Sequence, residues 1–234
     1  MSGAAITATS LRRELTELWI VRHAQSDGNL GGYVTGQMDV PLTATGHQQA
    51  QRVAKRLAGM SFAALYASDL QRATATAGYL SAAVALPILI DPRLRELDAG
   101  TWTGMTGAVI AEKFPEEWAA WQLRNPDMRR GGGIGESYNM GALRITQALT
   151  DIAERHHGER ILVVCHGGVM GLYLSYMMGL DRAHTWHLVV SNTGINRVRP
   201  FAVAVNGEPK RYGHIMSVND LAHLEQDTGI ADHQ

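Results

Sequence analysis

The chain has little of several features that would mark particular classes of protein. Its 234 residues include one cysteine, Cys165, which excludes an internal disulfide and fits a reducing compartment. The formal net charge is −1, which gives no reason to expect nucleic acid or an anionic membrane as a partner. No apolar run approaches the roughly 20 residues that span a bilayer. Together these absences predict a cytoplasmic protein.

The first residues also lack the pattern of a secretory signal. In MSGAAITATSLRREL the arginines follow a mildly apolar stretch, and no clear apolar core is present. We expect residues 1–16 to form a flexible tail. Because the sequence has no internal repeat and no linker, residues 17–234 are expected to form a single domain.

Two segments share one layout. LWIVRHA (18–24) and ILVVCHGG (161–168) are apolar runs that end in a histidine followed by small residues. Such continuous runs predict strands that are buried on both faces, as in a parallel α/β sheet. Since ligands bind beyond the carboxyl ends of such strands, His23 and His166 should face one crevice if the strands are neighbours. The alternative is two unrelated capping histidines.

The other patterns complete an α/β layout. Apolar residues at i, i+3, i+4 and i+7 predict a helix between Thr43, as N-cap, and Gly59, as its stop. Strands are also expected over 63–68, 87–90, 187–190 and 195–200, and helices from near Asp69, over 139–155 and over 169–179. The last two strands should form a hairpin across residues 191–194. The prediction is a three-layer sandwich with a mostly parallel central sheet and helices on both faces.

Residues 97–137 differ from the rest of the chain. They hold Trp102, Trp118 and Trp121, followed by a glycine-rich run. We interpret this segment as a helical insertion with a mobile loop that covers the sheet as a lid. Its tryptophans either pack the insertion or wall a pocket for a sugar or apolar group, and packing is the simpler role.

Two basic residues stand beside the glycines of this insertion. Arg129 and Arg130 are interpreted as a solvated surface pair. The alternative is that they reach a second anionic group of a ligand, such as a carboxylate or another phosphate. The sequence does not separate these roles.

Several kinds of chemistry compete for the strand ends. Arg22 carries a planar fork suited to phosphate, and the glycines after His166 open a helix whose N–H groups suit an anion. A surface salt bridge and a plain turn are the respective alternatives. Cys165 should point away from His166, because neighbouring strand residues face opposite sides, so a buried structural thiol is favoured over a nucleophile.

Metal and nucleotide chemistry have less support. The sequence has no HExxH, no GxxxxGK[ST] and no GxSxG. His184 and His187 lie close enough in sequence to ligate one metal ion together, and metal catalysis is kept as a minor alternative. We expect neither a metal nor a cofactor.

Five motifs in order carry a family resemblance. They are RHAQSDGN, TGQMDVPLTATGHQQA, SDLQRATATA, LRELDAGTWTG and CHGG, with NTGI and VNDLAHL further on. The chain resembles the histidine phosphatase superfamily, also called the phosphoglycerate mutase-like family, over nearly its whole length after the tail. One departure is Ala24, which replaces the glycine of the RHG motif.

The resemblance implies roles for individual residues. His23 would be the nucleophile that becomes phosphorylated, and Glu96 would protonate the leaving oxygen and then activate water, with Asp98 as its rival. The groups that would hold the phosphoryl oxygens are Arg22, Arg72, Asn29, His166 and the N–H of Gly167. Thr35 and Gly36 match positions on the substrate side, and Ser26 is expected to join the binding set.

The same resemblance implies a phosphatase of small-molecule phosphate monoesters that works through a phosphohistidine. The stretch from Thr101 to Ser137 is shorter than the mutase insertion and lacks its basic-aromatic pattern, which favours the phosphatase branch. Cofactor-dependent phosphoglycerate mutase chemistry and a non-catalytic binder are the alternatives. The expected partner is a small phosphorylated metabolite. A homodimer is left open, because the apolar helix over 169–179 suits either a core or an interface.

Overall fold

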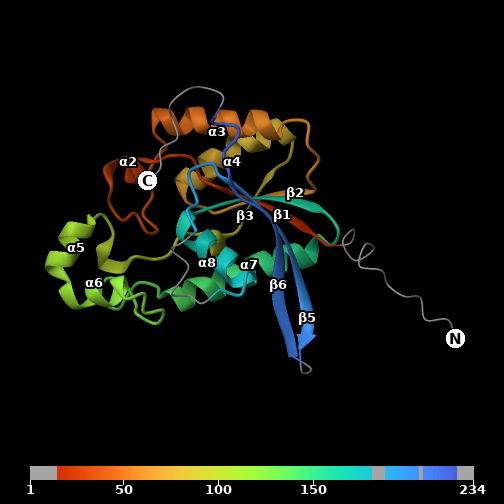
Figure 1. Cartoon of the computed structure of the whole chain (residues 1–234). Coiled ribbons are helices and arrows are strands. Elements are labelled where there is room, and N and C mark those ends of the chain that lie inside the picture. The colour runs from red at the N-terminus through yellow and green to blue at the C-terminus, as the bar shows by residue number, and fades with distance from the viewer. Residues whose placement is uncertain (1–14, 181–187, 206–207, 226–234) are drawn as a thin grey trace.

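The computed structural model describes residues 15–180, 188–205 and 208–225, and its centre is one six-stranded sheet (Figure 1). The strands are β1 (Glu17–Arg22), β2 (Ala64–Ala67), β3 (Ile88–Ile90), β4 (Arg160–Cys165), β5 (Ile195–Val205) and β6 (Glu208–Asp220). Their order is β3-β2-β4-β1-β5-β6; the first four are parallel, and β5 and β6 are antiparallel. The predicted, mostly parallel sheet is confirmed.

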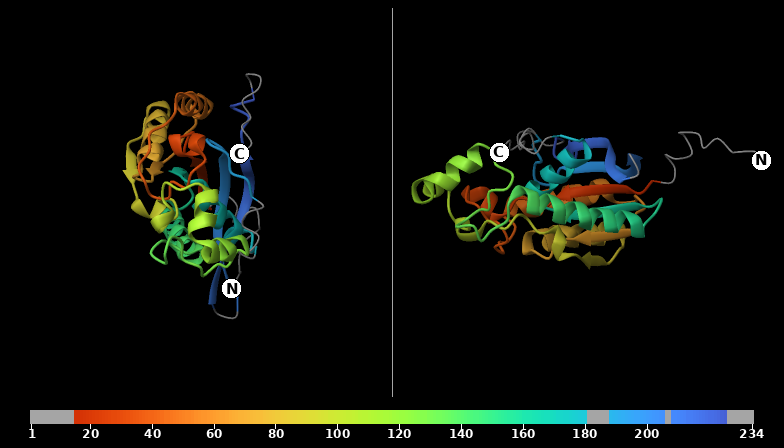
Figure 2. Two further views of the ribbon diagram at one scale, coloured as in Figure 1. Left: turned by 90° about the vertical axis from the view of Figure 1, so that its left-hand side faces the viewer. Right: turned by 90° about the horizontal axis from the view of Figure 1, so that it is seen from below.

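Helices cover both faces of this sheet. The α-helices are α2 (Asp27–Gly31), α3 (Ala44–Leu57), α4 (Gln71–Val84), α5 (Gly107–Lys113), α6 (Pro115–Gln122), α7 (Tyr138–Arg155) and α8 (Gly167–Met177). Two 3-10 turns, Pro92–Leu94 and Gly100–Trp102, lie in the loop before α5. Figure 1 and Figure 2 show α3 and α4 on one face and α7 and α8 on the other, which confirms the layered fold.

The central strand explains why its sequence is apolar at every position. Leu18 and Ile20 belong to the core beneath α7 and α8, whereas Trp19 and Val21 belong to the core beneath α3 and α4. All four side chains are buried. Because successive residues of a strand face opposite sides, a strand covered twice needs apolar residues throughout.

The predicted ends of helix α3 are confirmed. The Thr43 hydroxyl accepts a hydrogen bond from the N–H of Gly46, which satisfies one of the free donors of the first turn. The helix ends before Ala58, and Gly59 follows with φ 77°, a left-handed conformation that favours glycine.

The predicted late hairpin is wrong. Residues 188–190 form no strand, and His187 lies outside the described residues. Residues 191–194 are a turn bound to the end of β1, where the Thr193 N–H donates to the Arg22 carbonyl over 3.0 Å. β5 instead pairs with β1 on one side and β6 on the other. Strand β6 was not predicted, since EPKRYGHIMSVND contains no apolar run.

The remaining described parts of the fold are the inserted segment and the residues before β1. Helices α5 and α6 lie beyond one end of the sheet (Figure 1), in the stretch for which a lid is predicted. Thr16, which the prediction placed in the tail, is buried, and its hydroxyl donates to the Ala153 carbonyl over 2.8 Å. None of the helices in the described ranges has the length and apolar character that a membrane crossing requires.

Candidate active site

The carboxyl ends of β1 and β4 bring the two predicted histidines together. The strands pair in parallel with Arg22 opposite Cys165, and the His23 N–H donates to the Cys165 carbonyl over 2.9 Å. His23 and His166 therefore follow in register, with their ring centroids 5.0 Å apart. Both side chains are buried. The expectation of one shared crevice is confirmed.

His23 is held as a neutral ring with one unprotonated nitrogen. Its Nδ1 lies 2.8 Å from the Ala24 carbonyl oxygen, so Nδ1 carries the proton and donates it. Nε2 accepts a hydrogen bond from Nε of Arg72 over 3.3 Å. Burial, and then the charges of Arg22 and Arg72, hold the pKa of His23 well below its usual value. Nε2 is thus unprotonated, as a nucleophile requires.

His166 is arranged as a donor. Its Nε2 lies 2.9 Å from the Ser68 hydroxyl, which itself accepts the N–H of Leu70 over 3.3 Å. Ser68 can therefore donate its own proton to Nε2, which leaves the ring proton of His166 on Nδ1. Nδ1 is buried and has no hydrogen-bond partner within the described ranges. Burial, with the positive charges of Arg72 and Arg22 added to it, holds the pKa of His166 well below its usual value.

Arg72 lies in the first turn of α4 and is almost completely buried. Its Nη1 donates to the Met38 carbonyl and its Nη2 to the Gly36 carbonyl, each over 2.8 Å. Burial lowers the pKa of its guanidinium. These carbonyls fix the fork so that Nε faces His23.

Arg22 approaches the same point from the end of β1. Its Nη1 donates to the Val190 carbonyl over 2.6 Å, while its Nε is buried without a partner among the residues that the structure describes. A Cβ on Gly167 would lie 3.1 Å from this Nε, so the glycine allows Arg22 to lie against the start of α8. In the described part of the chain, neither Arg22 nor Arg72 forms an ion pair with a carboxylate. The almost completely buried Arg72 and the half-buried Arg22, without an ion-paired carboxylate, favour an anionic ligand.

Glu96 lies on the amino end of α8. Its carboxylate accepts the N–H groups of Gly168 over 2.9 Å, Val169 over 3.1 Å and Leu97 over 2.9 Å. Free N–H groups and the helix dipole favour a negative charge at this position. The sequence assigned the start of this helix to the phosphoryl group, and the structure assigns two of its N–H groups to Glu96, leaving that of Gly167.

Asp98, the rival acid, has a different place. Its Oδ1 accepts the Gly100 N–H over 2.9 Å and so shapes the turn that follows. Glu96 lines the cavity beside the histidines, and Asp98 does not. The geometry therefore favours Glu96 as the acid.

Asn29 and Ser26 form one unit at the start of α2. Ser26 is the buried N-cap residue, and both its N–H and its hydroxyl donate to Oδ1 of Asn29, over 3.1 and 3.0 Å. The same oxygen accepts from Nδ2 of Asn192 over 3.3 Å. Ser26 thus orients Asn29, and direct contact between Ser26 and a ligand stays a prediction.

The substitution of alanine for glycine after His23 is accommodated. Ala24 keeps a negative φ, so its methyl group causes no backbone strain. The side chain is buried with Leu42 and Ala50. Its N–H donates to the Thr76 hydroxyl over 3.0 Å, which fixes the carbonyl that binds His23.

A cavity of about 370 Å³ lies next to Glu96. Its lining includes Thr35, Gly36 and Gly168 from the site and Trp102, Trp118, Trp121 and Arg130 from the insertion. Thr35 and Gly36 line this cavity, and their contact with a substrate stays a prediction. The lid tryptophans both pack against one another and wall a pocket.

The expectation of a solvated arginine pair is wrong for Arg130. Arg129 is exposed, but Arg130 is only 6% exposed. Nη1 of Arg130 donates to the Glu136 carbonyl over 2.9 Å, and its guanidinium lies 4.3 Å from the centroid of the Tyr138 ring. The aromatic ring and the carbonyl account for its burial.

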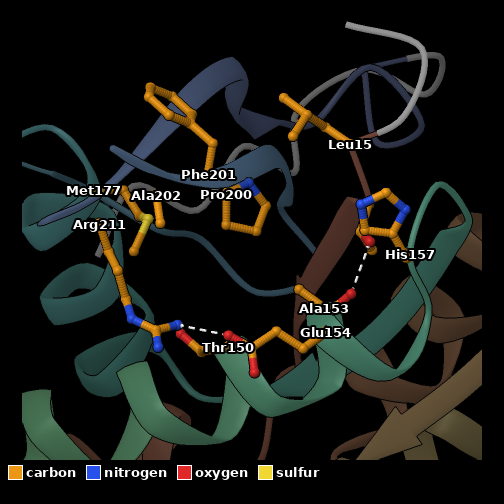
Figure 3. A pocket seen from close by; sticks show the side chains of 11 residues that line it. Leu15, Thr150, Ala153, Glu154, His157, Met177, Pro200, Phe201, Ala202 and Arg211 are labelled. Carbon is orange, nitrogen blue, oxygen red and sulfur yellow. Dashed lines mark hydrogen bonds and ion pairs between the residues drawn. The ribbon is translucent and has the colours of Figure 1, made fainter. Parts of the chain in front are cut away.

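A second cavity, of about 210 Å³, is shown in Figure 3, and neither His23 nor His166 lines it. Leu15 and Thr16 line it, which places it at the opposite end of β1 from His23. Arg211 and Glu154 form an ion pair of 3.2 Å at its edge. It contributes nothing to the histidine site.

Sequence reasoning missed three residues that hold the site. Ser68 binds His166, and Asn192 donates to the His23 carbonyl over 2.8 Å. Arg144, in the middle of α7, donates to the carbonyls of Arg93, Arg95 and Glu96, and so holds the acidic loop. Ser68 and Asn192 stand in motifs that were noted, SDLQRATATA and NTGI, without a role being assigned. Arg144 has no local signal at all.

The competing chemistries find little support in the described ranges. Cys165 is fully buried, and burial raises the pKa of its thiol, as expected of a structural cysteine. No three histidine, cysteine or acidic side chains of the described residues gather as metal ligands. His184 and His187 lie outside those residues.

Comparison with known proteins agrees with this geometry. Residues 18–203 match the model of the histidine phosphatase superfamily (branch 1). A metal-independent phosphoserine phosphatase of Arabidopsis thaliana is 38% identical over 164 residues, 69% of this chain and 68% of the relative. Phosphoglycerate mutase-like protein 4 of the same plant is 38% identical over 216 residues, 91% and 89% of the two chains. The structure of Bacillus stearothermophilus YhfR matches with a TM-score of 0.79 at 29% identity, covering 90% of this chain and all of that one.

Proposed function

Since this chain belongs to the histidine phosphatase superfamily and is a phosphatase, we propose that it hydrolyses small-molecule phosphate monoesters in the manner of a histidine acid phosphatase, through a phosphohistidine formed on His23. One observation carries the proposal. The unprotonated Nε2 of His23 lies among the buried Arg72, the half-buried Arg22 and two buried nitrogens that have no partner in the described part of the chain, Arg22 Nε and His166 Nδ1. A phosphoryl group would supply the missing acceptors and the missing negative charge.

The first step would form the phosphohistidine. The Nε2 lone pair of His23 attacks phosphorus, a new N–P bond forms, and the P–O bond to the leaving group breaks. Glu96, which takes up the proton of the incoming phosphate monoanion, gives it to the leaving oxygen, which departs as an alcohol. Arg22, Arg72 and His166 hold the phosphoryl oxygens, which is most of what phosphoryl transfer requires.

The second step would restore the enzyme. The Glu96 carboxylate takes a proton from water as the water oxygen attacks phosphorus, and the N–P bond breaks. Phosphate leaves and His23 returns to its neutral form, with Nδ1 still donating to the Ala24 carbonyl. The cycle needs no metal and no cofactor.

We also propose a partner and a cellular location for the enzyme. The partner is a small phosphorylated metabolite, and phosphoserine, named for the plant relative, is a substrate to test. The single buried cysteine supports a cytoplasmic location. Transfer of phosphate between the positions of phosphoglycerate is the alternative reaction, and it would exceed phosphate release if this were a mutase.

Replacement of His23 tests the mechanism. His23→Ala should abolish both phosphate release and acid-labile labelling of the protein by a ³²P-phosphate ester. His157→Ala, at an exposed histidine, is the matched control and should retain both. Full turnover by the His23 variant would rule out the phosphohistidine, and binding without any turnover by the unaltered protein would indicate a non-catalytic binder.

A further inference from the structure

The cavity beside Glu96 indicates what the leaving group looks like. Glu96, the proposed acid, and Gly36, whose carbonyl binds Arg72, both line this cavity, so the cavity opens where the leaving group would lie. Resting on the proposed function, we propose that the preferred substrates are phosphate monoesters whose alcohol carries a flat apolar group, seated against the tryptophans of the insertion.

The wall of the cavity is built from the rings of the insertion, of which Trp121 also packs against the main core. Trp118 and Trp121 lie one turn apart on α6, with stacked rings whose centroids are 4.7 Å apart. Both are partly exposed, and α6 has no fully buried residue. Trp102, only 2% exposed, meets Trp118 edge-on at 6.4 Å and holds it in place. A flat apolar group would continue this stack.

The size of the cavity fits more than a short polar alcohol. Its 370 Å³ lies within the range of small-molecule pockets, and at roughly 30 Å³ per water it holds about a dozen waters. Ile110 and Leu97 add apolar surface to the lining. Release of water from such walls favours an apolar occupant.

The charged residues of the lining are placed at its edges. Glu96 is bound to the N–H groups of α8, and Arg130 is bound to the Glu136 carbonyl and lies over the Tyr138 ring. Both charged groups therefore already have partners within the protein. The lining as a whole selects by shape and apolar contact, which distinguishes it from a site for a small charged alcohol.

Two esters of matched chemistry test the proposal. 2-Phenylethyl phosphate and ethyl phosphate are both esters of primary alcohols, and they differ in the flat apolar group. We expect kcat/KM to be roughly 10- to 100-fold higher for the phenylethyl ester, the effect of burying one ring. In Trp118→Ala this ratio should fall to within about threefold of unity, through loss of the phenylethyl reaction alone. Leu123→Ala, which removes an apolar side chain 82% exposed just after α6, is the matched control and should keep the ratio.

The outcomes separate the two proposals. Equal kcat/KM for the two esters in the unaltered protein would overturn the inference on the leaving group while leaving the phosphatase intact. Failure to release phosphate from either ester, or from any other monoester, would instead remove the proposed function. If Trp118→Ala does not fold, Trp118→Leu keeps an apolar side chain without the flat ring, and an unchanged ratio in that variant overturns the inference.

Discussion

The phosphate end of the site and the tryptophan wall are built in different ways. At the phosphate end, Arg22, His23 and Arg72 are fixed by hydrogen bonds to backbone carbonyls, and His166 by one to the Ser68 hydroxyl. The wall consists of apolar rings on two short helices of an insertion, packed on one another. The sheet thus dictates the chemistry, whereas the insertion can vary its side chains without disturbing the sheet.

The largest expected effect is at the phosphate end and comes from Arg72. Arg72→Ala removes a buried charge beside His23 and leaves the carbonyls of Gly36 and Met38 without their donors. We expect kcat/KM to fall roughly 10³- to 10⁵-fold, as when an arginine that stabilises phosphoryl transfer is lost. Arg211→Ala, at an exposed ion pair, should change it little. A loss of under tenfold for Arg72→Ala would break the distinction between the two ends.

Glu96 stands where the two ends meet, and its effect should depend on the substrate. Glu96→Gln should lower turnover of alkyl phosphates roughly 10²- to 10⁴-fold, because the alkoxide then leaves without a proton. The loss should be much smaller for 4-nitrophenyl phosphate, whose leaving group needs no proton. Asp98→Asn should show no such dependence on the leaving group. If Asp98→Asn shows it and Glu96→Gln does not, the acid has been assigned to the wrong carboxylate.

Ser68 holds His166 and accepts the Leu70 N–H at the start of α4, and it is not placed in contact with the phosphoryl group, so its effect should be smaller. Ser68→Ala leaves Nε2 of His166 without its partner, and we expect kcat/KM to fall roughly 10- to 100-fold. Nitrogen NMR of His166 should show the proton on Nδ1 in the unaltered protein and a changed tautomer in the variant. Ser68→Thr, which keeps the hydroxyl, should restore both. A proton found on Nε2 in the unaltered protein would contradict this role.

The smallest effect concerns stability rather than rate. The pKa values of His23 and His166 are lowered in the folded protein, so below about pH 6.5 the unfolded chain takes up protons that the native site refuses. Stability should be constant above that pH and fall below it, by up to about 1.4 kcal/mol per pH unit for each histidine. Urea unfolding at several pH values measures this slope. His166→Gln should reduce the slope, while Trp118→Leu, on the wall, should leave it unchanged.

The sequence allowed much of the phosphate end to be predicted. Two apolar runs that each end in histidine indicated strands buried on both faces of a parallel sheet. In the structure these two strands, β1 and β4, are parallel neighbours. The place of Arg130 could not be predicted, because its burial depends on a carbonyl and a ring that the fold brings to it. Strand β6 was not predicted for a related reason. It lies at the edge of the sheet and pairs with β5, and its described residues are at most half-buried, so it has no apolar pattern to detect.

The position of β1 has a consequence for the synthesis of the chain. Its neighbours, β4 and β5, follow more than a hundred residues later. Strand β1 is therefore synthesised long before either of the strands that pair with it. At roughly 5–20 residues per second, the ribosome takes on the order of 10 s or more to supply those partners. During that interval Leu18 and Ile20 lack α7 and α8, which bury them, and His23 and Arg22 lack the rest of their site. A nascent chain that ends before β4 is therefore catalytically silent and is a natural client for a chaperone.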